Sequence, residues 1–495
     1  MSTTASSGDV APAVAALARR LRAVAPFLDA GADVALAHGP LLAALAEAVR
    51  LDPEPARIWL LATAVAGGYP TQSEVIDIRR GLQAARPGTA MAAVLTGVAA
   101  TASASRDEAL DAVVLVGATI ADVEFCATHV HNTGIQRVVR NTMPHWASRH
   151  DPVFVAWSAD ITGYRHLTPM QRALVVEYRS GMPAPTDVPA SVLLIPWQGV
   201  VVIPEVPAAE LLPRQAALAR FSGNRVVLLG HDAIPVANAH TVVDAESDRF
   251  AHYLEVVKYS SLIACNSETT AVEFAGFLSM LPAQGLAGPR VTAVPLPVDL
   301  ATQDTALAST DRSEPLVLTV GSVEPRKNQQ GVLSAAQLLW AQGLDFELLV
   351  VGGGHSFYLE QFDREVRRLH RAGHRVRVGR GVSDAVLAQA YADAHMVVFP
   401  SLQEGYGLPV AEALATGTPV VTTNYGSTAE IARGGGCLLV DPRDDDDIAA
   451  KMRSLLTDSA LHARLVAEAK ARRDATWADY AEALWSASRS AGGAA

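Results

Sequence analysis

The sequence of 495 residues contains few cysteines and few aromatic side chains. Its three cysteines, Cys126, Cys265 and Cys437, lie far apart and lack the close spacing of metal ligands. Cys265 and Cys437 fall inside apolar runs that resemble strands, so we expect buried free thiols. This use of cysteine is typical of a reducing cytoplasm.

Long apolar runs are also missing, because none reaches the roughly 18 residues of a membrane span. The first residues, MSTTASSGDVAPA, lack the basic stretch and apolar core of a secretory signal. We therefore expect a soluble, cytoplasmic protein. Peripheral contact with the inner face of the membrane is an alternative, since VAALARRLRAVAPFL places Arg19, Arg20 and Arg22 on an otherwise apolar helix. An ordinary packing helix explains the same pattern more simply.

There is no excess of positive charge. Lys and Arg together number 40 against 51 Asp and Glu, which gives a formal net charge of -11. A chain of this sign repels nucleic-acid phosphates, so we exclude a nucleic-acid partner. Local basic positions remain available for a small anionic ligand.

Strand patterns are absent from about residues 10 to 100. This part is rich in alanine and is typical of helices, which are broken by Pro26, Pro53, Pro55 and Pro70. We predict an all-helical domain over residues 1–110. Protein contact, formation of a homo-oligomer and approach to a membrane are all open as its purpose.

From residue 113 onwards, short apolar runs alternate with helical patterns. Six strands are predicted in the first half, at VVLVG, VFVAW, SVLLIP, RVVLLG, LIACN and VTAVP. Six more are predicted in the second half, at LVLTVG, FELLVVGG, RVRVG, MVVFP, PVVTT and CLLV. Such alternation favours parallel sheets that are covered by helices on both faces.

The predicted fold is therefore α/β, with two doubly wound parallel-sheet domains that face each other across a cleft. We place a first Rossmann-like domain at residues 111–305 and a second at residues 306–475. Residues 476–495 are predicted to form a helix that crosses back to the first domain. The segment LPVDLATQDTALASTDRSEP, which is small and polar in composition, is predicted to be the linker.

Ligands of an open parallel sheet bind beyond the carboxyl ends of its strands, where loops enter helices. After LVLTVG, the sequence SVEPRKNQQ places Arg326 and Lys327 beside a helix start. Two cations in this position would hold a diphosphate by ion pairing, and backbone N–H groups would add hydrogen bonds. A pair of solvated surface charges is the alternative.

Two glutamates flank the segment EGYGLPVAE, which follows the predicted strand MVVFP. Glu404 lies in the loop, and Glu412 lies about one turn into a helix that Pro409 opens. The amides of Gly405 to Leu408 could hold phosphate or sugar oxygens, while Glu404 accepts hydrogen bonds from sugar hydroxyls and Glu412 from ribose hydroxyls. The alternatives are a solvated loop charge at 404 and an acid that stabilises its own helix dipole at 412.

Three further features have structural explanations. Gly352 to Gly354 lack the third glycine of the dinucleotide fingerprint and indicate a tight turn from strand to helix. Asp444 to Asp447 are predicted to cap a helix, and Ser267 is predicted to cap another. No G-x-S-x-G motif supports a hydrolase.

The run PSLQEGYGLPVAEALATGTPVVTTNYGSTAEIA resembles the signature of retaining family-4 glycosyltransferases with the GT-B fold, which carries an E-x7-E element. VGSVEPRKN resembles the phosphate-binding loop of that family, and TGIQRVVRN (133–141) resembles the glycine loop of its N-terminal domain. LLGHDAIPV (228–236) is similar to its HD-x-x-P stretch, and TWADYAEALW (476–485) to its closing helix. The matches run in family order over about residues 112–488 and leave the first hundred residues uncovered.

The resemblance implies that Lys327 and Arg326 hold the nucleotide diphosphate and neutralise charge on the leaving group. It also implies that Glu404 contacts the donor sugar, that Glu412 contacts the ribose and that His231 lies near the reacting sugar carbon. The other donor-binding positions that it implies are Gly134, Arg137, Gly321, Ser322, Gly405, Tyr406, Gly407 and Leu408.

The sequence departs from the family pattern at Ser322, where many relatives carry arginine, and we expect Arg326 to supply that charge. Glu430 matches a recurrent acid of the family but has no clear role. A metal pair at His129 and His131 is an alternative, although the family needs no metal and no acidic third ligand lies at a useful spacing. We expect no cofactor, with a nucleotide diphosphate sugar as co-substrate.

The predicted function is transfer of a hexose to an acceptor hydroxyl with retention, in glycan or glycoconjugate biosynthesis. The TGIQR and HD-x-x-P variants favour mannose or rhamnose. The acceptor is open among glycans, lipid-linked molecules, proteins and small molecules. A nucleotide-sugar epimerase of the same fold and a non-catalytic scaffold partner are the alternatives, and the missing glycine fingerprint disfavours a nicotinamide-dependent oxidoreductase.

Overall fold

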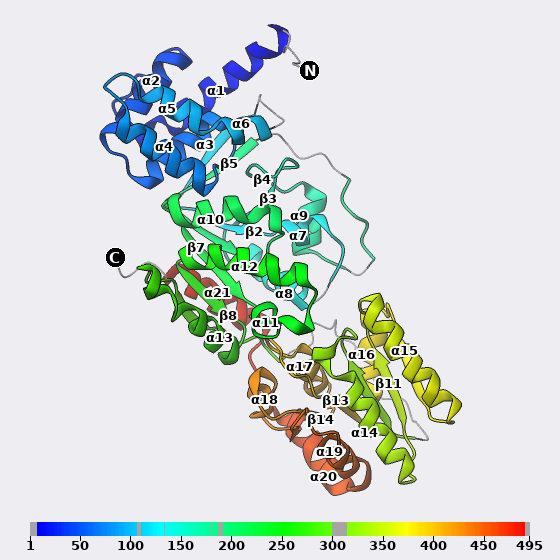
Figure 1. Ribbon diagram of the computed structural model, residues 1–495. Coiled ribbons are helices and arrows are strands. Elements are labelled where there is room, and N and C mark those ends of the chain that lie inside the picture. Colours follow the sequence, from blue (N-terminus) through cyan, green and yellow to red (C-terminus); the bar gives the residue numbers. More distant parts are fainter. Residues whose placement is uncertain are drawn as a thin grey trace.

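The computed structural model describes residues 7–105, 110–132, 134–179, 181–186, 192–298 and 314–490. Most of the predicted linker lies outside these residues. The molecule is elongated (Figure 1). The helical region forms one end, the first sheet region lies in the middle and the second sheet region forms the other end.

The N-terminal region is helical throughout its described residues, as the sequence predicted. Thr71 and Glu74 form a capping box at the start of the helix Gln72–Ala84. The Glu74 carboxylate accepts a hydrogen bond from the Thr71 amide at 2.8 Å. Pro26 lies inside the first helix rather than at its end. The helices are α1 (Ser7–Leu28), α2 (His38–Leu51), α3 (Pro55–Ala66), α4 (Gln72–Ala84), α5 (Ala90–Gly97) and α6 (Ala99–Ala104).

These helices share one apolar core with the first sheet. The ring of Tyr69, which follows α3, lies 5.2 Å from the ring of Trp59 and 5.4 Å from the ring of Tyr164, a sheet residue. The Tyr69 hydroxyl also donates a hydrogen bond to the carbonyl of Leu194 in the sheet. The helical region is therefore joined to the sheet by buried aromatic contacts rather than held on a free linker.

The three arginines of α1 are engaged within the molecule. Arg20 is buried and donates to the carbonyls of Ala64 and Leu110, both at 2.8 Å. Arg19 pairs with Asp111, and Arg22 donates to the carbonyl of Val34 at 2.9 Å. These contacts favour the simpler interpretation of α1 as a packing helix.

The first sheet has nine strands in the order β1-β5-β4-β3-β2-β6-β7-β8-β9. All six strands predicted for this half are present, and three short strands, β2, β4 and β6, were missed. The predicted parallel pairing is confirmed except at β4, which pairs antiparallel with both neighbours. The strands are β1 (Asp111–Val116), β2 (Thr119–Asp122), β3 (Val153–Trp157), β4 (Tyr164–His166), β5 (Val192–Trp197), β6 (Val200–Ile203), β7 (Arg225–Gly230), β8 (Leu262–Cys265) and β9 (Arg290–Ala293).

Helices connect these strands and cover the sheet (Figure 1). Ser267 caps one of them, because its hydroxyl accepts a hydrogen bond from the Thr270 amide at 3.0 Å, which confirms the predicted cap. The α-helices are α7 (Glu124–Thr128), α8 (Gly134–Arg149), α9 (Pro169–Val176), α10 (Leu212–Phe221), α11 (Ile234–Ala237), α12 (Asp244–Tyr259) and α13 (Glu268–Leu278). Short 3-10 helices lie at η1 (Ala209–Leu211), η2 (Ala239–Thr241) and η3 (Leu281–Gln284).

The second sheet has six parallel strands in the order β12-β11-β10-β13-β14-β15, and all six were predicted. They are β10 (Leu316–Val320), β11 (Glu347–Val351), β12 (Val376–Gly379), β13 (Met396–Phe399), β14 (Val420–Thr423) and β15 (Cys437–Val440). The helices are η4 (Pro325–Lys327), α14 (Gln329–Ala341), α15 (Ser356–Arg371), α16 (Asp384–Asp393), α17 (Leu408–Ala415), α18 (Gly426–Ala432), α19 (Asp445–Thr457) and α20 (Ser459–Ala471). Asp444 caps α19 by accepting from the amides of Asp446 and Asp447, as predicted.

The last helix, α21 (Trp477–Ser490), returns from the second sheet region and lies against the first (Figure 1). The indole of Trp146 on α8 donates to the carbonyl of Ala481 at 2.8 Å, and its ring meets that of Trp485 edge-on at 5.1 Å. The two sheet regions are therefore connected by two passages of the chain, the second of which is anchored by α21.

No described helix is both long and apolar enough to cross a membrane. Cys126, Cys265 and Cys437 are free. The prediction of a buried free thiol is confirmed for Cys265, whereas Cys437 is only partly buried. Burial raises the pKa of Cys265 and Cys437 to about 12, so both remain protonated and unreactive near neutral pH.

Candidate active site

A cleft of about 540 Å³ lies between the two sheet regions. Its walls are formed by the loops that follow β10, β11 and β13 in the second region, and by α8 and the loops after β7 and β8 in the first. Of the thirteen predicted site residues, all except Arg326 line this cleft. The twelve are Gly134, Arg137, His231, Gly321, Ser322, Lys327, Glu404, Gly405, Tyr406, Gly407, Leu408 and Glu412.

Lys327 and Glu404 form the first charged pair in the cleft, with 2.6 Å between Nζ and Oε1. Lys327 ends the 3-10 turn after β10, and Glu404 lies in the loop after β13, so two adjacent parallel strands deliver the pair to one edge. The hydroxyl of Ser401 donates to the same Glu404 oxygen at 2.6 Å. Both charged side chains are about nine-tenths buried, with 12% of Lys327 and 10% of Glu404 exposed.

Arg326 lies outside the lining of the cleft. Its guanidinium pairs with Glu404 at 3.0 Å and with Glu324 at 2.8 Å, and it donates to the carbonyl of Gln403 at 2.7 Å. Burial disfavours the charge on Glu404, but the attraction of Lys327 and then of Arg326 holds the pKa of this carboxyl below its ordinary value. Both cations therefore keep Glu404 ionised, but of the two only Lys327 lines the cleft.

A second pair crosses the cleft between Arg137 on α8 and Glu412 on α17. Nη1 of Arg137 lies 2.5 Å from Oε1 of Glu412, and the hydroxyl of Tyr391 donates to Oε2 at 2.7 Å. Glu412 is only 3% exposed. The sequence predicted both residues as ligands of the donor but gave no reason to expect that they contact each other.

The loop between the two glutamates approaches the first sheet region closely. A side chain at Gly405 would overlap the carbonyl oxygen of His231, so only glycine fits. Gly407 has φ 110°, a left-handed conformation that suits glycine, and precedes α17, in which Pro409 occupies the first turn as predicted. Tyr406 is 7% exposed and donates its hydroxyl to the carbonyl of Leu296 at 2.7 Å.

His231 is buried at the end of β7 and lies 2.8 Å, through Nε2, from the carbonyl of Pro204. Because a carbonyl only accepts, Nε2 carries the hydrogen. Burial lowers the pKa of His231, against the opposing effects of the Pro204 carbonyl and Asp232, so the ring is neutral and Nδ1 is unprotonated.

Two polar residues of the cleft were not singled out from the sequence. Asp232 follows His231 and lines the cleft, where burial raises its pKa against the attraction of Arg326. Asn266 lies just beyond β8, and its Oδ1 is buried without a hydrogen-bond partner among the described residues. Both follow strand ends, so reading every strand end in the first sheet would have found them.

Arg140 organises the loop that leads into the cleft at Gly134. Its guanidinium donates to the carbonyls of His131 at 2.7 Å and His129 at 2.6 Å, and it stacks over the ring of Tyr178 at 3.9 Å. His131 lines the cleft. Arg140 is buried, so its role is to position backbone rather than to present charge to a ligand.

Glu430, whose role the sequence left open, joins the two sheet regions. Its carboxylate accepts hydrogen bonds from the amides of Glu268 at 2.9 Å and Thr269 at 2.6 Å, in the first turn of α13. Arg433 pairs with Glu268 at 2.9 Å beside it. An acid from α18 thus satisfies the N-terminus of a helix in the other region.

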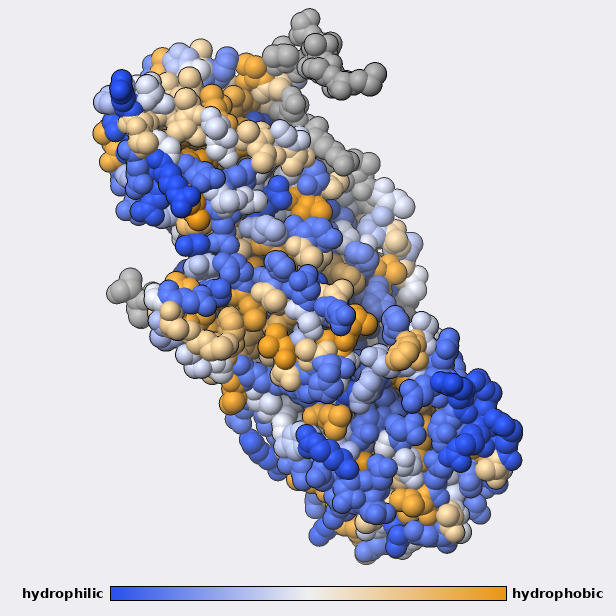
Figure 2. All heavy atoms as spheres, viewed as in Figure 1, coloured by the Kyte–Doolittle hydropathy of each residue, from blue (hydrophilic) through white to orange (hydrophobic). Residues whose placement is uncertain are grey.

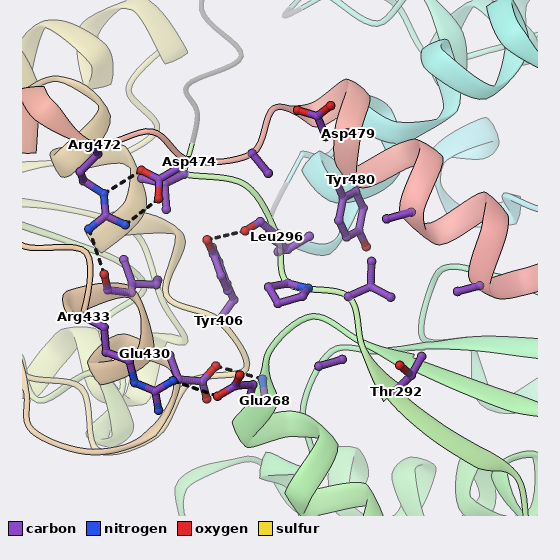
Figure 3. Close-up of a pocket in the computed structure, with 18 residues that line it drawn as sticks. Glu268, Thr292, Leu296, Tyr406, Glu430, Arg433, Arg472, Asp474, Asp479 and Tyr480 are labelled. Atoms are coloured by element: carbon purple, nitrogen blue, oxygen red, sulfur yellow. Dashed lines mark hydrogen bonds and ion pairs between the residues drawn. The ribbon is translucent and has the colours of Figure 1, made fainter.

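A second cavity, of about 690 Å³, lies on the other side of Tyr406 (Figure 3). It is larger than the cleft and also contains ion pairs, namely Arg472 with Asp474 at 2.7 Å and Arg433 with Glu268. Figure 3 shows the hydroxyl of Tyr406 directed at Leu296 in the middle of this view. Twelve of the thirteen predicted site residues line the smaller cleft, so we take that cleft as the candidate site of chemistry.

Among the described residues, no three His, Cys, Asp or Glu side chains gather closely enough to hold a metal ion. The two histidines considered for a metal pair are used differently. His129 stacks on Phe125 at 4.3 Å, whereas His131 lines the cleft.

Comparison with known sequences finds similarity in the second sheet region. Residues 305–472 match the family model of glycosyl transferases group 1. Over 157 residues the chain is 37% identical to O-antigen chain mannosyltransferase B of Escherichia coli, which covers 31% of this chain and 41% of that protein. Over 164 residues it is 35% identical to D-inositol 3-phosphate glycosyltransferase of Rhodococcus opacus (strain B4), which covers 32% and 37%. The chain thus spans about two fifths of the length of these relatives.

Solved structures match a larger part of the chain. The crystal structure of Anabaena Alr3699/HepE in complex with UDP and glucose aligns with a TM-score of 0.51 at 15% identity, over 76% of this chain and 99% of that one. The N-terminal domain of Candida albicans trehalose-6-phosphate phosphatase aligns with a TM-score of 0.54 at 10% identity, over 76% and 97%. The two facing sheet regions adopt the GT-B fold, and the second of them matches the family model of glycosyl transferases group 1.

Proposed function

We propose that this protein is a retaining glycosyltransferase of family 4. It transfers a hexose, for which mannose is the favoured choice, from a nucleotide diphosphate sugar to an acceptor hydroxyl in glycan or glycoconjugate biosynthesis. The observation that carries the proposal is the convergence of Lys327, Glu404 and Glu412 on one cleft. The match to glycosyl transferases group 1 and the similarity to a mannosyltransferase support it.

The donor diphosphate would bind where the ammonium of Lys327 meets the backbone of Gly321 and Ser322. Lys327 is paired with Glu404, and this contact holds the ammonium where the diphosphate would bind. When the bond between the sugar carbon and the phosphate oxygen breaks, negative charge develops on the phosphate. A preorganised cation that is about nine-tenths buried stabilises this charge more than an exposed one would.

Glu404 and Glu412 would accept hydrogen bonds from hydroxyls, the first from the donor sugar and the second from the ribose. Glu404 is suited to this because its lowered pKa keeps it ionised near neutral pH. The neutral ring of His231 presents no positive charge to compete with these acids. We propose that the His231 ring lies beside the reacting sugar carbon, where its polar contacts position the donor sugar.

The transfer itself needs no protein nucleophile in this proposal. The acceptor hydroxyl attacks the sugar carbon from the face on which the phosphate leaves, and its proton passes to the departing phosphate oxygen. One carbon–oxygen bond forms, one breaks, and the nucleotide diphosphate is released. Contacts such as Glu430 with α13 hold the two regions together around the cleft, which excludes water and favours transfer over hydrolysis.

Thermal shift measurements with GDP-mannose, UDP-glucose and dTDP-rhamnose test the donor site. One tightly bound donor should raise the apparent melting temperature, because binding to the folded state adds RT ln(1 + [L]/Kd). Lys327→Ala and Glu412→Ala should abolish the shift. Lys451→Ala on α19, which lies outside the cleft lining, is the matched control and should keep it.

The reaction class is then tested by incubation of the binding donor with and without a panel of acceptors. Glycosylated product that retains the anomeric configuration supports the proposal. Epimerised donor sugar formed without any acceptor would instead identify an epimerase. A full thermal shift in both Lys327→Ala and Glu412→Ala would refute the site.

A further inference from the structure

A cavity of about 250 Å³ lies in the helical region, away from the cleft described above. Three arginines line it: Arg79 and Arg80 from α4, and Arg220 from the end of α10. Its apolar lining comes from Pro55, Val75, Ile76 and Phe221. The cavity therefore combines a cationic rim with an apolar floor.

The spacing of the residues on α4 explains how the cavity forms. Ile76, Arg79, Arg80 and Gln83 recur at intervals of three and four, which places them on one face of the helix. Arg220 and Phe221 end α10, which packs beside α4. Figure 2 shows strongly hydrophilic residues gathered over the part of the helical region where α4 lies.

The positive charge of this cavity is poorly neutralised. No carboxylate is among the side chains that line it. Arg79 makes no ion pair with any described residue, and the pair of Arg80 with Asp77 is 3.4 Å long between side chains that are 75% and 65% exposed. Ion pairs as exposed as this one contribute little.

Arg220 is held in place without being neutralised. Its Nη1 donates to the amide oxygen of Gln72 at 2.9 Å, and the guanidinium stacks over the rings of Phe221 at 4.8 Å and Tyr259 at 4.5 Å. A guanidinium fixed by an amide and two aromatic rings keeps its remaining donors available. The net charge of the protein is -11. Three arginines around one cavity therefore form a local positive site on an otherwise acidic protein.

We propose that this cavity binds the phosphate group of a small amphipathic ligand. The arginines bind the phosphate oxygens with charge-assisted hydrogen bonds, which guanidinium groups form in pairs. The apolar part of the ligand packs on Val75, Ile76 and Phe221. At about 30 Å³ per water, the cavity has the room of roughly eight waters, which suits one phosphate with a short apolar group.

Calorimetric titration with phenyl phosphate, inorganic phosphate and phenol tests this site. The protein carries Lys327→Ala throughout, so that phosphate binding in the cleft does not contribute. We expect phenyl phosphate to bind, inorganic phosphate to bind more weakly and phenol to show no saturable binding. Arg79→Gln and Arg220→Gln should each weaken phenyl phosphate binding about tenfold, since a hydrogen bond to a charged group contributes on this scale.

Arg86→Gln is the matched control, because Arg86 lies just beyond α4, is exposed and does not line the cavity. It removes the same charge and should change the affinity less than twofold. If Arg79→Gln and Arg86→Gln weakened phenyl phosphate binding equally, the loss would come from the change in net charge rather than from a contact in the cavity. That result would overturn the proposal. Absence of saturable binding by phenyl phosphate would also overturn it.

The phosphate could belong to a soluble molecule or to a lipid headgroup. Co-sedimentation with vesicles that contain phosphatidic acid, lost in Arg79→Gln, would assign the lipid source, whereas phenyl phosphate binding without co-sedimentation would assign a soluble one. Neither result depends on glycosyl transfer. In the otherwise native chain, Arg79→Gln should leave the thermal shift by the sugar nucleotide unchanged, so failure of this proposal and failure of the proposed function are distinguishable.

Discussion

Arg137 and Glu412 form an ion pair across the cleft, although the first belongs to α8 and the second to α17 in the other sheet region. A donor whose ribose is bound by Glu412 would meet this pair on entry. Because Glu412 is buried, separating the pair without replacement would leave a costly uncompensated charge. The donor hydroxyls or phosphate must therefore supply new partners as Arg137 is released.

The strength of this pair can be measured by a double-mutant cycle with Arg137→Ala and Glu412→Gln. We expect a coupling energy of about 1 to 3 kcal/mol in the free energy of unfolding, because the residues are in contact and one is buried. Denaturant unfolding of the four proteins gives this number. Additivity within about 0.5 kcal/mol would show that the contact contributes nothing to holding the regions together.

Tyr391→Phe tests the second partner of Glu412 without altering charge. The change removes the hydroxyl that donates to Oε2 at 2.7 Å, while Arg137 still pairs with Oε1. We expect donor affinity to fall by up to about tenfold, the loss of one hydrogen bond to a charged group. Thermal shift titration with the preferred donor measures it, and an unchanged affinity would argue against Glu412 as a ligand.

Gly405→Ala should prevent the loop after β13 from seating against the first sheet region. Its side chain would overlap the carbonyl of His231, which is backbone and has little room to move. We expect kcat/KM to fall at least tenfold, because a small displacement of bound groups is costly in catalysis. Steady-state kinetics with donor and acceptor checks this.

Gly276→Ala is the control for that change. Gly276 lies within α13, where an added side chain meets nothing within 4 Å. It should leave kcat/KM unchanged and raise stability by roughly 0.5 to 1 kcal/mol, because alanine favours a helix over glycine. Similar kinetic losses in both variants would remove the steric explanation.

The parts of the site that the sequence predicted are those with local patterns. The pair Arg326 and Lys327 and the segment from Glu404 to Glu412 follow strong strand runs, and parallel topology alone brings strand ends to one edge. What the pattern could not supply was the partner of each charge. That Arg326 lies behind Glu404 rather than in the cleft depends on side-chain packing, which no spacing rule encodes.

Among the missed strands, β2 has a different explanation. β2 reads TIAD, and its Asp122 is unsuited to a buried strand by propensity. In the fold its carboxylate accepts hydrogen bonds from Trp157, Tyr164 and Gln215, each at 2.9 Å. These partners come from distant parts of the chain, so tertiary contacts override the local signal.

Glu430→Gln tests the connection between α18 and α13. The neutral amide has one oxygen where the carboxylate offers two to the amides of Glu268 and Thr269. We expect faster hydrogen exchange at these two amides and a loss of about 1 kcal/mol in stability, as for a lost helix cap. Glu360→Gln on the exposed face of α15 is the control, and equal exchange in the two variants would contradict the assignment.

Glu124 makes the stability of the first sheet region depend on pH. Burial raises its pKa to about 7, against the hydrogen bond from the Trp157 amide at 2.6 Å. A carboxyl whose pKa is higher in the folded state holds its proton there after the unfolded chain has lost it. Its contribution to stability is therefore complete below the ordinary pKa of 4.5 and is lost as pH rises from 4.5 to about 7.

Glu124→Gln should remove this part of the pH dependence, because the amide oxygen can still accept from Trp157 and carries no proton to lose. Relative to the unsubstituted protein, we expect the variant to gain about 1 to 3 kcal/mol in unfolding free energy between pH 4.5 and pH 7.5. Glu404 contributes in the opposite direction, since its lowered pKa makes its stabilisation disappear as pH falls, and it is unchanged in both proteins. Denaturant unfolding at several pH values gives the two curves. If the two curves of unfolding free energy against pH run parallel through this range, burial does not raise the pKa of Glu124 and the prediction is wrong.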